Sequence, residues 1–207
     1  MILLYYGIMI AGALAMVIIF FLHQSFLPLE RAVLILPWAE VEKDRRANTG
    51  EVTMAGETMC VRYESGEEHE FRAEGLRVSP EGAALVRLGD RPLLIVLDRG
   101  RGRKAYVVDT ARAAAKGDFD AGILGWWKHG TGTCVAAAGA HVIEVHRCYG
   151  RDRIYWIDPL RAMAGNAFGM GIERTLIAPT RNVDGVEYVD RCICVARGAR
   201  MWKVELT

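Results

Sequence analysis

The residues best suited to bind a metal ion are two pairs of side chains in the second half of the chain. His146 and Cys148 are two positions apart, and so are Cys192 and Cys194. On β-strands each pair shares one face, so two neighbouring strands would bring four nitrogen and sulfur ligands together as a tetrahedral structural zinc site. The competing and commoner interpretation is that these side chains are simply buried in a β core.

A second constellation is a run of basic residues interleaved with glycines, Arg99, Arg101, Arg103 and Lys104, at the expected tip of a hairpin. Arginines on such a loop can wrap phosphate groups, either of anionic lipid or of nucleic acid. The alternative is a solvated loop whose charges prevent edge-to-edge aggregation. The formal net charge of +1 favours this alternative and makes nucleic acid an unexpected partner.

No set of residues in the sequence has the spacing of a catalytic site. Serine occurs only at positions 25, 65 and 79, and none of the three lies in a Gly-x-Ser-x-Gly motif. The Gly-Thr-Gly-Thr stretch at 130–133 lacks the third glycine of a dinucleotide-binding turn, and no P-loop motif occurs. We therefore predict no catalytic residues, and no cofactor besides the zinc ion considered above.

The elements that must position these residues begin with an apolar segment. Residues 1–22 carry no charged side chain, and about 20 apolar residues suffice for a helix to cross the core of a bilayer. A cleavable signal peptide is disfavoured because no basic residue precedes the segment, and a buried helix because it has no polar face. We expect an uncleaved single-pass anchor, followed by a juxtamembrane connector over residues 23–50.

Several residues predict what surrounds this anchor. Gly7, Ala11 and Ala15 recur every four residues, which favours packing against another helix in a homo-oligomer or against other membrane subunits. Trp38 is expected at the membrane interface, where aromatic residues are enriched. Basic residues downstream of the segment, beginning with Arg31, favour a cytoplasmic location for the rest of the chain.

Residues 51–207 show short apolar or alternating runs separated by turn residues, which predict strands. Strands in succession with few short helices predict an antiparallel β sandwich or barrel, with a possible subdivision near 116–122. No period of 20–50 residues is apparent, which disfavours a solenoid. The adjacent Trp126 and Trp127 are expected to anchor a partner protein.

The composition adds two expectations. Asparagine and glutamine are scarce, with three Asn and one Gln, and the depletion of thermolabile amides is typical of thermophile proteins. Five cysteines without a Cys-x-x-Cys motif fit a reducing compartment better than a fully paired disulfide framework.

These observations lead to three hypotheses about function. The leading one is a structural or accessory subunit of a larger membrane-associated assembly, in contact with membrane lipids and other subunits. The first alternative is a module that binds anionic lipid or nucleic acid through the 99–104 loop. The second is a membrane-tethered metalloprotein built on His146, Cys148, Cys192 and Cys194.

Overall fold

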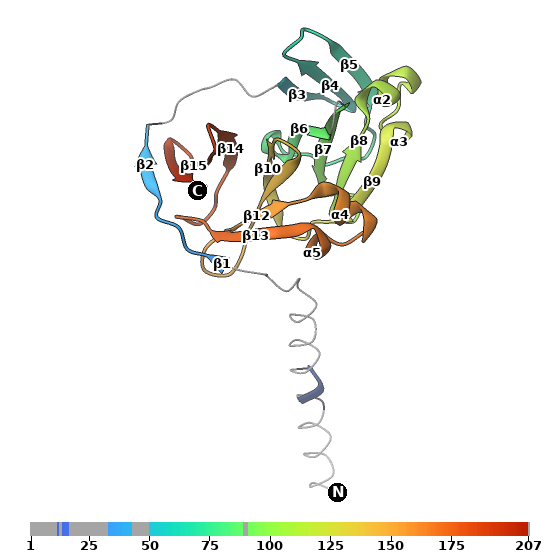
Figure 1. Cartoon of the computed structure of the whole chain (residues 1–207). Helices are drawn as coiled ribbons and strands as arrows, with labels where there is room; N and C mark the ends of the chain where they lie inside the picture. The colour runs from blue at the N-terminus through green and yellow to red at the C-terminus, as the bar shows by residue number, and fades with distance from the viewer. Residues whose placement is uncertain (1–11, 13, 17–32, 43–49, 89–90, 207) are drawn as a thin grey trace, which may run out of the picture.

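The computed structural model describes residues 12, 14–16, 33–42, 50–88 and 91–206. Within these ranges the chain is mostly β, and its strands form four small sheets in a propeller-like arrangement (Figure 1). The prediction of one sandwich or barrel is therefore wrong. Neither two large facing sheets nor one closed sheet forms, because each short run of strands makes its own sheet and buries its faces against the neighbouring sheets.

The four sheets follow one another along the chain. The first consists of β3 (Gly50–Ala55), β4 (Thr58–Tyr63) and β5 (Glu68–Arg72). The second consists of β6 (Ala83–Leu88), β7 (Arg91–Asp98), β8 (Lys104–Val108) and β9 (Ile123–Lys128). The third contains β10 (Gly132–Ala138), β11 (His141–His146), β12 (Arg153–Ile157) and β13 (Ile172–Ile177). The fourth contains β14 (Gly185–Val189), β15 (Cys192–Arg197) and β16 (Arg200–Glu205).

The first strands of the sheets lie beside one another, β3 next to β6, β6 next to β10 and β10 next to β14. The helical turns are all short. They are the 3-10 turn η1 (Pro80–Gly82) and the helices α2 (Thr110–Lys116), α3 (Phe119–Gly122), α4 (Pro159–Ala164) and α5 (Phe168–Gly171).

Two strands from the N-terminal part of the chain complete the last two sheets. β1 (Val33–Leu34) runs parallel to β13, and β2 (Ala39–Val41) pairs antiparallel with β16. Between them, the Trp38 indole Nε1 donates a hydrogen bond of 3.1 Å to the carbonyl of Ile177. Part of the segment predicted to connect an anchor to the domain is thus built into the domain, and Trp38 packs there rather than at a membrane interface.

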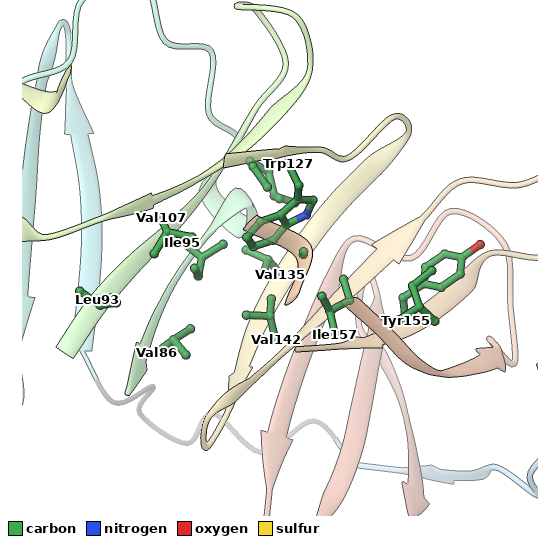
Figure 2. Packing of buried hydrophobic residues seen from close by; sticks show 13 residues of the cluster. Val86, Leu93, Ile95, Val107, Trp127, Val135, Val142, Tyr155 and Ile157 are labelled. Atoms are coloured by element: carbon green, nitrogen blue, oxygen red, sulfur yellow. The ribbon is translucent and has the colours of Figure 1, made fainter. Parts of the chain in front are cut away.

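The burial of each strand follows from the sheets beside it. Leu93 through Asp98 in β7 are all buried, because β7 lies inside a sheet that is covered on both faces. β3, at an edge, alternates between partly buried and exposed residues instead. Figure 2 shows the core between the second and third sheets, where Ile95 and Val107 meet Val135, Val142 and Ile157.

The second and third sheets are two copies of one structural unit. We call residues 83–128 the first unit and residues 132–177 the second. Lys104–Lys128 in the first unit aligns without a gap with Arg153–Ile177 in the second, 49 positions later. The residues shared at this separation include Tyr106 and Tyr155, Asp109 and Asp158, Arg112 and Arg161, Phe119 and Phe168, and Gly122 and Gly171. The statement that no period of 20–50 residues exists is therefore corrected.

The shared residues build the same junction in both units. Asp109 and Asp158 are N-caps whose carboxylates accept hydrogen bonds from the first backbone N–H groups of α2 and α4. Their own N–H groups donate to the carbonyls of Gly122 and Gly171, at 2.9 and 2.8 Å. A Cβ on either glycine would approach the alanine one turn into the helix, Ala113 or Ala162, within 2.7 Å. The repeat therefore reflects identical packing, not only similar sequence.

The predicted single-pass anchor, with the cytoplasmic domain that it implied, is also corrected. In the described part of the chain, no helix has the length and apolar character needed to cross a membrane. Among the helices α2 to α5, the longest is α2, which has 7 residues, about a third of the number that a membrane-spanning helix requires. Of the proposed packing face, Ala15 is helical and exposed, whereas Gly7 and Ala11 lie outside the described residues.

Candidate functional site

The unusual feature of the core is a group of hydrogen-bonded polar side chains between the first and second units. Trp127 at the end of β9 is fully buried, and its Nε1 donates to Glu144 Oε1 of β11 at 2.9 Å. Glu144 Oε2 lies 2.8 Å from His146 Nε2. The carboxylate is completely buried and His146 is 6% exposed, so both are removed from water. We call Trp127, Glu144 and His146 the buried polar chain.

Aromatic residues of the second unit enclose His146. Its ring is stacked on Phe168 of α5, with centroids 4.5 Å apart, and meets the edge of Tyr155 at 4.9 Å. This packing fixes the orientation of the imidazole, and a carboxylate in a low-dielectric site hydrogen-bonds more strongly than one in water. The group therefore adds a buried hydrogen bond between two sheets that pack mainly through apolar side chains.

His129 lies next to this group, at the start of the turn between β9 and β10. Its Nε2 is 3.0 Å from the carbonyl oxygen of Asp98, and since a carbonyl can only accept, Nε2 carries the proton. Nδ1 is buried and has no hydrogen-bond partner among the described residues. Burial lowers the pKa of His129, and the nearby carboxylate of Glu144 opposes this effect in part. His129 is thus held neutral at neutral pH.

The scaffold does not require these polar residues. Arg72 of β5 and Lys128 of β9 bridge to Asp118 and Ala167, which occupy equivalent positions in the two units. By this correspondence Trp127 occupies the position equivalent to Phe71, and His129 occupies the position equivalent to Ala73. His146 pairs with Arg153 as Asp98 pairs with Lys104, and Arg153 and Lys104 are equivalent, so His146 occupies the position that corresponds to Asp98. In the same way, Glu144 occupies the position that corresponds to Val96. The preceding interface therefore has phenylalanine, alanine and valine at three of these positions and Asp98 at the fourth, so the buried polar chain occurs only in the later interface.

The basic residues of the 99–104 loop are engaged within the fold. Arg101 forms an ion pair with Asp120 at 2.8 Å, and Arg99 Nη2 donates to the carbonyl of Thr133 at 3.1 Å. Lys104 Nζ lies 4.0 Å from the ring centroid of Trp126. Arg103 is exposed. The loop therefore does not present four convergent charges to a phosphate group.

The two adjacent tryptophans do not lie on one surface. As neighbours on a strand they point to opposite faces, so Trp127 is buried in the polar chain while Trp126 packs beneath Lys104. Trp127 is therefore covered by the fold, and Trp126 is half-buried.

The residues of the predicted zinc site are not brought together. His146 ends β11 in the third sheet and bonds to Glu144, whereas Cys192 and Cys194 lie on β15 in the fourth. In the described ranges, no group of three or more histidine, cysteine, aspartate or glutamate side chains is arranged to hold a metal ion. Burial also raises the pKa of the Cys134 thiol to about 12, which keeps it protonated.

A second constellation that sequence reasoning missed is a hollow beyond the end of β11. It has a volume of about 310 Å³, and two arginines contribute to its wall. Its lining residues are Arg147, Cys148, Tyr149, Gly150, Asp152, Arg181 and Asn182.

The sequence did contain one signal for the buried polar chain, since Glu144 interrupts an otherwise apolar stretch of a strand.

Comparison with known proteins does not place the chain in a family. No protein-family model matches it, and no curated protein sequence matches it significantly. The two copies within the chain are therefore the best available reference for distinguishing residues that the fold needs from residues that serve another purpose.

We expect the variant Glu144→Val, which introduces the residue of the equivalent position, to lower the free energy of unfolding by about 3 kcal/mol. It leaves the Trp127 Nε1–H and the His146 ring buried without their acceptor, and each such loss costs about 1–3 kcal/mol. The measurement is urea unfolding followed by circular dichroism. In the double variant with Trp127→Phe, we expect the two effects to be non-additive by at least about 1 kcal/mol. Additive effects would show that the indole and the carboxylate are not coupled.

We also expect the stability to fall as pH decreases through the ordinary histidine pKa of about 6.5. The unfolded chain takes up a proton at His129 there, whereas folded His129 does so only at lower pH, so acid favours unfolding. Between pH 7.5 and 5.5 this residue contributes a loss of at most about 1.4 kcal/mol. The control is His129→Ala, which should show a smaller loss over the same interval. An identical pH dependence of both proteins would rule out this role.

Proposed function

We propose that the chain is a non-catalytic accessory subunit that binds a partner protein through the paired helices α4 and α5. The observation that carries this proposal is the exposure of two large apolar side chains on these helices. Leu160 on α4 is 56% exposed and Met170 on α5 is 65% exposed. Burying them against a partner would gain about 25 cal/mol for each Å² of apolar surface removed from water.

Single exposed apolar residues are ordinary, so the comparison between the two units matters here. The positions equivalent to Leu160 and Met170 in the first unit are Ala111 and Ala121. Alanine at both positions is compatible with the same helix pair, which means that the larger side chains are not needed to form it. Their presence in one copy only favours a role in binding.

A third exposed apolar residue lies on a neighbouring element. Leu124 of β9 is 47% exposed, and β9 lies against α4, which in turn packs on α5. The equivalent position on β13 is the charged residue Glu173. We call Leu124, Leu160 and Met170 the apolar surface. Leucine and methionine adapt their shape to a partner, and a surface of this kind supports protein binding better than catalysis.

The test is site-specific photo-crosslinking of the full-length chain in its native cells. A photoreactive residue at position 160 or 170 should capture one recurrent partner protein, and the same residue at matched positions 111 and 121 should not. Capture of another copy of this chain, equal capture at all four positions, or no capture at all would contradict the proposal.

A complementary variant separates binding from folding. The double substitution Leu160→Ala and Met170→Ala copies the first unit, so we expect it to change the free energy of unfolding by less than about 0.5 kcal/mol. It should reduce affinity for the captured partner at least tenfold, as measured by calorimetry. A large loss of stability would instead assign these residues to the fold.

A further inference from the structure

The hollow beyond β11 lies between two loops that are tied to each other. The loop from β11 to β12 contributes Asp152, whose carboxylate accepts a hydrogen bond of 2.8 Å from the N–H of Val183 in the loop after β13. The Asp152 carbonyl also accepts from the N–H of Ala178 at 2.9 Å. Because Asp152 is buried, both bonds are shielded from water. The walls of the hollow are therefore held in place before any ligand arrives.

Two arginines give this hollow its charge. Arg147 and Arg181 are both exposed. Ion pairs in the described part of the chain include those of Arg62, Arg72, Arg101, Arg161 and Arg200, and none of these pairs involves Arg147 or Arg181. The carboxylate of Asp152 lines the hollow as well, but it is directed to the backbone of Val183. The hollow is thus lined by two arginines and by one carboxylate that is already hydrogen-bonded.

The corresponding loop of the first unit uses its arginines within the fold. Arg99, which follows Asp98 as Arg147 follows His146, donates to the carbonyl of Thr133. There Arg101 is neutralised by Asp120, and the position equivalent to Asp120 in the second unit is Gly169. The loop of the second unit is also longer by one residue, since His146 pairs with Arg153 whereas Asp98 pairs with Lys104. This longer loop carries Tyr149, whose side chain is fully exposed beside the hollow.

We propose that this hollow binds a small phosphate monoester. Its phosphate would be held by Arg147 and Arg181, since guanidinium groups match phosphate oxygens with paired hydrogen bonds. A phosphate monoester carries a charge of about −1.5 to −2 at pH 7, which two arginines neutralise. The organic part of the ligand would contact the ring of Tyr149, because an exposed aromatic ring beside basic residues is a stacking platform. The volume of about 310 Å³ is at the lower end for ligand sites, which fits a small molecule.

The test is isothermal titration calorimetry of the full-length chain with phenyl phosphate, and with inorganic phosphate as the ligand that lacks a ring. We expect saturable binding of phenyl phosphate that is at least tenfold tighter than that of inorganic phosphate and weakens with added salt. Arg147→Gln and Arg181→Gln should each reduce the affinity for phenyl phosphate at least tenfold. Arg147→Lys keeps the charge but not the paired geometry, and should give an intermediate loss.

Matched controls distinguish this site from general electrostatic attraction. Arg103→Gln removes an exposed arginine from the equivalent loop of the first unit and should leave the affinity unchanged. Tyr149→Ala should weaken phenyl phosphate without affecting inorganic phosphate. The proposal is overturned if phenyl phosphate shows no saturable binding, if both ligands bind equally well, or if Arg103→Gln weakens binding as much as the pocket variants. This outcome is independent of the apolar surface, which lies on other elements.

Discussion

The packing of the two repeated units depends on one buried carboxylate. Glu144 is removed from water, and the cost of burying it is offset because each of its oxygens has a partner, Trp127 on one side and His146 on the other. Apolar contacts around this group are non-directional and allow sheets to slide. Of the two hydrogen bonds, the one from Trp127 joins the second sheet to the third, and the one to His146 holds the carboxylate in place within β11. This directional contact therefore restricts how the two sheets can move relative to each other.

Away from this interface the two units share one scaffold. Both use the same capped helix, the same close glycine contact and the same buried tyrosine, while the shared phenylalanine is buried at position 119 and partly buried at position 168. The differences lie at the interface and at the surface. Polar residues replace apolar ones at Glu144 and His129, while Leu160 and Met170 replace alanines on the outside. A residue that occurs in one copy only is not required by the scaffold that both copies share, so it is best explained by another role.

Local features of the fold could be predicted from the sequence, whereas its long-range arrangement could not. The apolar run Leu93–Leu97 indicates a central strand, and β7 is buried from Leu93 to Asp98. A propeller-like set of sheets and a sandwich contain the same short strands and turns, however, so the local pattern does not distinguish them. The repeat was visible only as scattered identities, because the residues between Tyr106 and Gly122 and between Tyr155 and Gly171 have mostly diverged.

The candidate sites illustrate the same limit. The ion pair of Arg101 depends on Asp120, which lies in α3 and is brought close only by folding, so the sequence left a phosphate site on the basic loop as an alternative to a solvated loop. The two cysteines on β15 belong to a different sheet from His146, and no local pattern reports the sheet to which a strand belongs. Strand alternation did contain the correct information for Trp126 and Trp127, since it requires that only one of them faces the core.

The most direct test of the central constraint is the hydrogen exchange of the Trp127 indole Nε1–H, measured by nuclear magnetic resonance and assigned with Trp127→Phe. A hydrogen bond to a carboxylate that is completely buried predicts exchange as slow as that of the most protected backbone amides, because opening requires the two units to separate. Exchange as fast as that of a solvent-exposed indole would contradict the buried polar chain, and with it the account of how the two units are held together.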